Sequence, residues 1–220
     1  MANVYISTGV SKLGASIPSI NLPPIVTCNP NAPCFKDCYA RRGHFMYQNV
    51  KNKYIDNLKA YKENPKQFFE DVAHGTRLSL YTRWHSSGDI VDEQYLAGMC
   101  WVARKNKNVQ YLAFTKQFRI VNKFVADGHK IPKNLHIVYS CWKNWVPENP
   151  YNFPTTWVYF PNKKEGVYNE LIPTKAVPCS GKCYACQKCW ELKKGESVVF
   201  RKHWWYNLLR SCAIGYTGLY

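Results

Sequence analysis

Seven of the ten cysteines stand in two tight groups, and thiolates are strong metal ligands. The downstream group lies in PCSGKCYACQKCW, where Cys179, Cys183, Cys186 and Cys189 are separated by three, two and two residues. One loop with this spacing can surround a single metal centre, and clustered thiolates repel one another unless a cation holds them. Structural zinc usually takes two separated cysteine pairs, whereas several cysteines in one run are typical of iron–sulfur ligation. The pattern favours a closed [4Fe-4S] cluster, with zinc as the alternative metal.

The upstream group lies in CNPNAPCFKDCYARRG and has only three cysteines, Cys28, Cys34 and Cys38. One interpretation is a zinc site that His44 completes as the fourth ligand. The other is a [4Fe-4S] cluster in which one iron has no protein ligand. Such an open iron can bind a substrate or cofactor, by the same logic that leaves one position open on a catalytic zinc.

The whole chain sets the context for these thiols. Its 220 residues are 46% hydrophobic, which is enough for one packed domain spanning residues 1–220, with a cysteine-rich segment at about 175–195. No signal peptide and no long apolar run is recognisable, so we expect no membrane partner and a cytoplasmic protein with reduced thiols. The net charge of +16 indicates a polyanionic partner such as tRNA or DNA.

The rhythm of apolar residues predicts strands that alternate with helices. Apolar residues three and four apart predict a helix over 46–63, and Asn64-Pro65 ends it and starts the next. Further helices are expected at 92–104, 117–127 and 203–213, and strands at 77–84, 109–115, 135–140, 156–160, 175–179 and 197–200. Short strands alternating with helices argue for an α/β domain with a parallel sheet.

Polar residues follow directly after several of the predicted strands, where ligands bind in parallel α/β folds. They are His85, Ser86, Ser87, Gly88, Asp89, Thr115, Lys116, Ser140, Cys141 and Cys179. Three of them also have purely structural interpretations. Asp89 can be a helix N-cap, His85 a core histidine and Lys116 the solvated start of a helix.

The segment CFKDCYARRG, followed by a helix and then by RWHSSGD after a strand, resembles an uncharacterised phage-encoded protein family. That family shares a Cys-Tyr-Ala motif, an Arg-x-His-x-Ser-Gly-Asp motif and a downstream cysteine group. It is in turn distantly similar to radical S-adenosylmethionine (SAM) enzymes. The commonest radical SAM spacing is three and then two residues, which Cys179, Cys183 and Cys186 match and the upstream group does not.

The resemblance implies a partial (βα) barrel of parallel strands with cysteine-rich cluster loops. It places an open [4Fe-4S] cluster on Cys28, Cys34 and Cys38, where SAM binds the free iron, and an auxiliary cluster on the downstream group. The Ser87-Gly88-Asp89 segment stands where such enzymes bind the SAM amino group.

The predicted function is reductive cleavage of SAM to modify an anionic substrate, with nucleic acid as one candidate. We expect Thr115 and Ser140 to help bind the cofactor, and His85 and Lys116 to act on the substrate. An electron donor such as flavodoxin or ferredoxin is then required. The alternative is a non-catalytic nucleic-acid-binding protein that zinc or an inert cluster stabilises.

Overall fold

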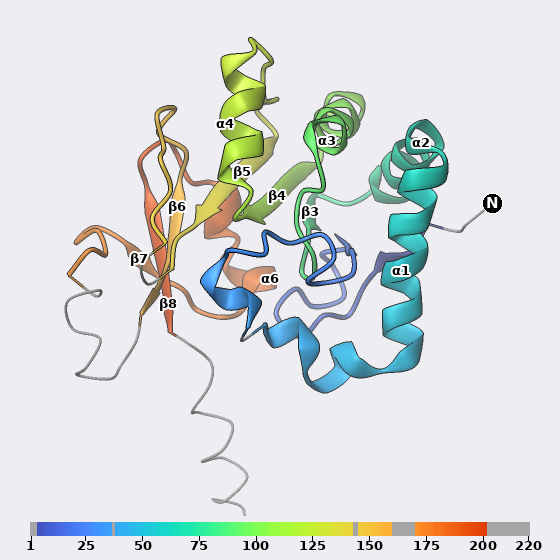
Figure 1. Cartoon of the computed structure of the whole chain (residues 1–220), viewed down its shortest axis with the longest axis horizontal. Helices are drawn as coiled ribbons and strands as arrows, with labels where there is room; N and C mark the ends of the chain where they lie inside the picture. Colours follow the sequence, from blue (N-terminus) through green and yellow to red (C-terminus); the bar gives the residue numbers. More distant parts are fainter. Residues whose placement is uncertain (1–3, 37, 143–144, 160–169, 202–220) are drawn as a thin grey trace, which may run out of the picture.

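A single sheet organises the chain in the computed structural model, which describes residues 4–36, 38–142, 145–159 and 170–201 (Figure 1). Its strands are β1 (Ile6–Ser7), β2 (Ser19–Ile20), β3 (Tyr81–Trp84), β4 (Gln110–Thr115), β5 (Leu135–Ser140), β6 (Thr155–Tyr159), β7 (Val177–Pro178) and β8 (Ser197–Arg201). They are arranged in the order β1-β2-β3-β4-β5-β6-β8-β7. Only β1 is antiparallel to its neighbour among these pairs.

The predicted mixed α/β fold with mostly parallel strands is therefore confirmed. The partial (βα) barrel is not confirmed and stays a prediction, because the strands form one sheet whose edge strands, β1 and β7, do not pair with each other in the described residues. The expected strands at 77–84 and 175–179 are shorter than predicted, since only Tyr81–Trp84 and Val177–Pro178 pair with neighbours.

The helices are α1 (Gln48–Glu63), α2 (Pro65–Thr76), α3 (Glu93–Lys105), α4 (Phe118–Ala126) and the short α6 (Cys183–Cys186). Short 3-10 helices are η1 (Pro33–Phe35), η2 (Tyr39–Arg41), η3 (Gly43–Met46) and η5 (Lys188–Trp190). Asn64 ends α1 and caps α2, because its side chain accepts a hydrogen bond from the Gln67 amide and Pro65 has no amide hydrogen to satisfy. The helix expected at 203–213 lies outside the described residues.

One face of the sheet, here called the helix face, packs against α1, α2, α3 and α4. Alternate strand residues point to it, among them Trp84 on β3, Tyr111 on β4 and Ile137 on β5. Each meets buried helix residues such as Leu96, which is 0% exposed. Fully burying such an apolar side chain contributes about 1.5–3 kcal/mol. The cluster on this face is larger than the one on the opposite face, so it supplies most of the hydrophobic stabilisation.

The opposite face, here called the cysteine face, is covered by two irregular segments. Leu112 on β4 and Val138 on β5 pack there against Leu13 from the loop after β1. The same cluster includes Trp190 and Leu192, together with Cys183 and Cys189 from the downstream cysteine group. The two faces therefore have different coverings, with helices on one and the cysteine-rich segment on the other.

None of the described helices combines the length and the apolar character that a membrane span requires.

Candidate functional site

The upstream cysteines lie in a long loop that follows β2, the first strand of the parallel part of the sheet. Cys28, Cys34 and Cys38 are all half-buried free thiols. The loop turns sharply before them, because the Thr27 hydroxyl donates to the Pro23 carbonyl at 2.9 Å and the Cys28 amide donates to Ile25 at 3.3 Å. Non-glycine Ile25 has φ of +72°, a conformation that bulky residues rarely adopt.

The three upstream thiols lie within electrostatic reach of one another. The pKa of Cys28 is raised to about 12, mainly by burial and in part by the negative charges of Asp89, Cys38 and Cys34. Burial also raises the pKa of Cys38, whereas the nearby Lys116 ammonium lowers it. A cation bound between these thiols would relieve both the burial cost and the mutual repulsion of their thiolates.

The segment Ser86–Asp89 follows β3 and packs directly on the start of the upstream loop. Asn21 holds it, because its side-chain oxygen accepts hydrogen bonds from the Ser86 amide at 2.8 Å and the Ser87 amide at 3.2 Å. The Ser87 hydroxyl donates to the Leu22 carbonyl at 3.0 Å. The two loops therefore form one unit at the carboxyl edge of β2 and β3.

Asp89 ties this unit to the next strand. Its Oδ1 accepts hydrogen bonds from the Thr115 hydroxyl at 2.6 Å and the Ile90 amide at 2.8 Å, and its Oδ2 accepts one from the Lys116 amide at 2.9 Å. Burial raises the pKa of Asp89, although these three hydrogen bonds lower it in part. Because a carboxylate oxygen can accept two hydrogen bonds, Oδ2 has unused acceptor capacity.

The N-cap interpretation of Asp89 is wrong. Helix α3 begins at Glu93, and the Asp92 side chain caps it by accepting a hydrogen bond from the Tyr95 amide at 2.7 Å. Asp92 is also hydrogen-bonded by the Tyr61 hydroxyl at 2.7 Å. Asp89 is thus free of any capping role and belongs to the strand-end network.

Lys116 extends the network to β5. Its Nζ donates to the Ser140 hydroxyl at 2.8 Å, and its charge acts on the thiols of Cys38 and Cys141. Its side chain therefore points along the strand ends and does not mark a solvated helix start. The structure brings together the predicted residues Ser87, Gly88, Asp89, Thr115, Lys116 and Ser140 at one edge of the sheet, beside Cys28 and Cys38.

His85 lies at the back of this edge and is 3% exposed. Its Nε2 is 3.2 Å from the Tyr95 hydroxyl, whereas its buried Nδ1 has no hydrogen-bond partner among the described residues. The pKa of His85 is lowered to about 3, mainly by burial and in part by the neighbouring Arg83 charge. The imidazole is neutral near pH 7, so it can take part in a hydrogen bond but holds no second proton to transfer.

The alternative ligand His44 packs against Phe45, with ring centroids 4.2 Å apart and ring planes tilted by 32°. Within residues 4–36, 38–142, 145–159 and 170–201, no three cysteine, histidine, aspartate or glutamate side chains converge tightly enough to hold a metal ion as they stand. The electrostatic coupling within each cysteine group shows that its thiols are nevertheless neighbours. Rotation of cysteine side chains would therefore be needed for either group to bind a metal.

The downstream cysteines line one hollow on the cysteine face, together with Trp190 and Val198. Their segment is fixed to the loop after β1, because the Cys183 amide donates to the Lys12 carbonyl at 2.8 Å. The pKa of Cys189 is raised to about 12, mainly by burial and in part by Cys179, Cys183 and Cys186. Cys179 and Cys186 are exposed, so the hollow opens to solvent on that side.

The adjacent Trp190 anchors this segment to the sheet. Its indole donates to the Thr82 carbonyl at 3.2 Å and its ring meets Tyr81 edge to face, with centroids 5.5 Å apart. Trp190 is 3% exposed. The four-cysteine segment is therefore seated on β3, the strand that leads into the Asp89 segment.

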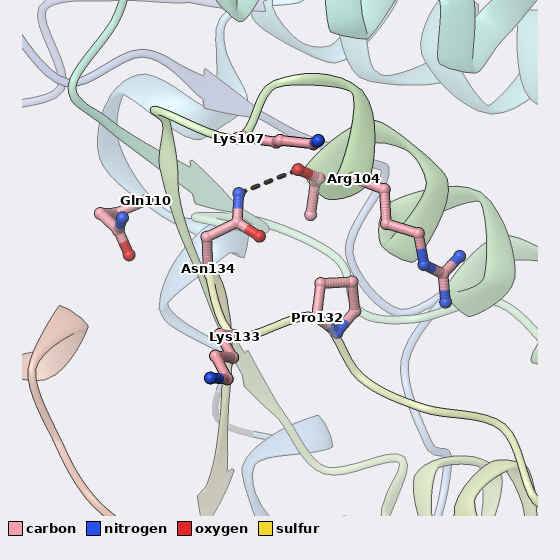
Figure 2. A pocket seen from close by; sticks show the side chains of 7 residues that line it. Arg104, Lys107, Gln110, Pro132, Lys133 and Asn134 are labelled. Atoms are coloured by element: carbon pink, nitrogen blue, oxygen red, sulfur yellow. Dashed lines mark hydrogen bonds between the residues drawn. The ribbon is translucent and has the colours of Figure 1, made fainter.

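A separate surface hollow of about 430 Å³ lies at the opposite, amino-terminal edge of β4 and β5 (Figure 2). Its lining includes the basic residues Arg104, Lys107 and Lys133, and the Asn134 side chain donates to the Ala103 carbonyl at 2.9 Å. No thiol or carboxylate side chain is among its lining residues.

Several residues of the site were not predicted from the sequence. Asn21, Thr27 and Tyr39 join the upstream loop to the Ser86–Asp89 segment, Tyr39 through a hydrogen bond from its hydroxyl to the Ser86 carbonyl. Arg83 is the residue of this group that the sequence could have indicated, because it places a charge inside the short strand Tyr81–Trp84. The others carry no local pattern, since their partners are more than 45 residues away in the chain or lie in an irregular loop.

Fold and site together define an α/β protein with a mostly parallel sheet, two cysteine groups and a polar network at the carboxyl edge of its strands. The model of the gene product 88 family matches residues 6–192, and the chain belongs to this phage-type family. The resemblance to a phage-encoded family is thereby confirmed, whereas its further likeness to radical SAM enzymes has no support from the comparisons. Searches of curated proteins and of solved structures found no match.

Proposed function

We propose that this chain is an iron–sulfur enzyme of radical SAM type that modifies an anionic substrate. The observation that carries the proposal is the junction between the upstream cysteine loop and the Ser86–Asp89 segment. Asp89 acts electrostatically on Cys28 and is hydrogen-bonded to the end of β4. A cofactor held on the thiols would therefore lie beside a buried carboxylate at the edge where parallel α/β folds bind ligands.

The residues fit the proposed groups. Once their side chains rotate to converge, the three upstream thiols suit a cluster with one open iron, and the four thiols of the downstream hollow suit a closed one. When bound, an open cluster with SAM supplies an electron and a radical that abstracts hydrogen from the substrate. The sheet, with helices on one face only, is proposed to be the partial barrel that encloses this reaction.

The chain's own residues would bind and orient SAM and the substrate. Asp89 Oδ2 has room for one more hydrogen bond, which suits the amino group of SAM. Lys116 and Ser140 place a positive charge and a hydroxyl beside the same edge, which suits a carboxylate. His85, as a neutral buried imidazole, would offer its unpartnered Nδ1 as a hydrogen-bonding group.

Anaerobic reconstitution and electron paramagnetic resonance test this proposal. Two [4Fe-4S] clusters bind about eight irons per chain, and Cys34→Ala should remove about half of them. Adding SAM to the reduced protein should change the upstream cluster signal, and Asp89→Asn should weaken that change. Thr115→Val is the matched control, because it removes a hydrogen bond to Asp89 but keeps the carboxylate.

The radical SAM proposal would be refuted by a colourless protein that contains stoichiometric zinc. It would also be refuted if SAM left the electron paramagnetic resonance spectrum of the wild-type protein unchanged. Loss of iron in His44→Ala would show instead that the upstream site is closed by that histidine. Reduced flavodoxin or ferredoxin would be the electron donor in the full reaction.

A second candidate is a non-catalytic nucleic-acid-binding protein, which the net charge of +16 favours. Its affinity for tRNA or DNA should fall steeply with salt, because each neutralised phosphate releases counterions. Binding without any effect of SAM would support this candidate, and no binding at low salt would remove it.

A further inference from the structure

Arg83 occupies an unusual place in the sheet. It lies in the middle of β3 between Ser19 on β2 and Leu112 on β4, and it alternates with Thr82 and Trp84, which point to the helix face. Its guanidinium carbon is 4.7 Å from the centroid of the Phe114 ring, a member of the cysteine-face cluster. The Arg83 side chain therefore lies on the cysteine face.

This guanidinium has no counter-charge in the protein part that the structure describes. Its Nε is buried without a hydrogen-bond partner, and no described carboxylate forms an ion pair with Arg83. Contact with the Phe114 ring is worth about 0.5–2 kcal/mol and replaces only part of the lost hydration. A half-buried arginine with five donors usually binds an anion that satisfies them.

The downstream thiols lie on the same face as Arg83, because the Phe114 ring beneath its guanidinium packs against the cluster that Cys183 and Cys189 also contact. The Arg83 charge acts on Cys183 and Cys189, in each case lowering the thiol pKa. Lys12 is a second cation in the same place, since it interacts electrostatically with Arg83, Cys179 and Cys183. The Cys183 amide also donates to the Lys12 carbonyl at 2.8 Å, so Lys12 and Arg83 lie on the face that the four-cysteine segment covers, where metal-bound thiolates would place negative charge.

We propose that Arg83 and Lys12 are the counter-charges of a metal bound by Cys179, Cys183, Cys186 and Cys189. Four thiolates around a doubly charged zinc ion or [4Fe-4S] core leave a net charge of about −2, which two cations neutralise. The same arrangement stabilises either metal, so the inference depends on the four-cysteine metal site of the proposed function and not on SAM. Arg83 is thus a positioning residue for the charge of the site, not a metal ligand.

Cobalt(II) is a suitable probe, because its tetrahedral thiolate complexes absorb visible light and it replaces zinc without redox chemistry. The full chain would carry Cys34→Ala to disable the upstream site, and its cobalt affinity would be measured anaerobically by competition with a chromophoric chelator. Arg83→Gln should weaken cobalt binding about 10- to 100-fold, the usual cost of losing a partner around the metal ligands. Arg83→Lys should restore most of the affinity, because it keeps the charge.

Arg104→Gln is the matched control for loss of one positive charge. Arg104 lines the hollow at the amino-terminal edge of the sheet (Figure 2). Its guanidinium donates to the Lys130 carbonyl at 3.0 Å. This variant should bind cobalt like the parent chain. Thermal unfolding of the metal-free variants would show that each is folded before the comparison is made.

Equal affinities of Arg83→Gln and Arg104→Gln would overturn the inference. So would an Arg83→Lys variant as weak as Arg83→Gln, since packing on Phe114 and not charge would then be the cause. Absence of cobalt binding in the parent chain would refute the four-cysteine site itself. An absent SAM effect in the resonance experiment would refute the radical SAM proposal and leave this inference standing.

Discussion

Gly88 holds the junction of the candidate site together, and replacing it tests whether that junction is as tight as the structure shows. The residue has φ of +83°, and an added Cβ would lie 2.7 Å from Leu22 Cβ, 2.8 Å from the Thr27 hydroxyl oxygen and 2.9 Å from the Leu22 carbonyl oxygen. Neither Leu22 atom can move aside by rotation of a side chain. Gly88→Ala must therefore push the upstream loop away from the end of β3.

The expected loss of stability has two parts. The left-handed conformation costs an alanine about 1–2 kcal/mol relative to glycine, wherever it occurs. Overpacking against fixed atoms adds about 1–3 kcal/mol. Gly128→Ala isolates the first part, because Gly128 has φ of +87° and a Cβ there would meet nothing within 4 Å. Gly88→Ala should therefore lower the free energy of unfolding by about 1–3 kcal/mol more than Gly128→Ala does.

Urea unfolding of the reduced, metal-free chain measures both variants, and iron content after reconstitution measures the site. Gly88→Ala should also retain less iron on the upstream cysteines, whereas Gly128→Ala should retain all of it. If the two variants lost equal stability, the close contact between Gly88 and Leu22 would not exist in solution. Equal iron retention would show that the contact does not position the cysteine loop.

Two further predictions concern the elements around the site. His85 has a folded-state pKa of about 3, below its unfolded value of about 6.5, so its contribution to stability is complete above pH 6.5 and is lost as the pH falls toward 3. The free energy of unfolding should therefore fall by about 2–3 kcal/mol between pH 7.5 and 4.5. Urea unfolding of His85→Gln at both pH values should show a smaller fall. An identical pH dependence in both proteins would contradict the buried neutral imidazole. Trp190→Ala should destabilise the chain by about 3–5 kcal/mol and expose Cys183 and Cys189 to thiol reagents, with the exposed Trp101→Ala as control. Unchanged thiol reactivity would show that Trp190 does not seat the segment.

Much of the fold could be predicted because local and tertiary preferences agree. The strand Leu135–Ser140 matches its prediction at both ends, since a run of β-prone residues is preceded by a proline-containing turn. Pro65 marks the start of α2 for a covalent reason that no tertiary contact can override. Boundaries elsewhere differ by a few residues, because strand pairing and not propensity decides where β3 begins.

The choice between Asp89 and Asp92 shows where the sequence is insufficient. Both are acidic residues shortly before a helical stretch, and either type can cap a helix. Asp92 takes the cap because its carboxylate also meets Tyr61 on α1, a contact that depends on how α1 packs against α3. Asp89 does not cap a helix and instead accepts hydrogen bonds from the end of β4. Tertiary packing therefore gives Asp89 the position that the proposed function requires.

The placement of the downstream cysteines on the sheet depends on contacts that no local pattern contains. Trp190 and Thr82 are 108 residues apart, and their hydrogen bond decides which face of the sheet the four thiols cover. The charge in the middle of β3 is a trace of this arrangement in the sequence, because partial burial of an arginine removes hydration that a nearby anion can replace. In the inference proposed above, thiolates that a bound metal holds together would be that anion. The proposed metal would therefore account both for an arginine in the middle of β3 and for four cysteines on the same face of the sheet.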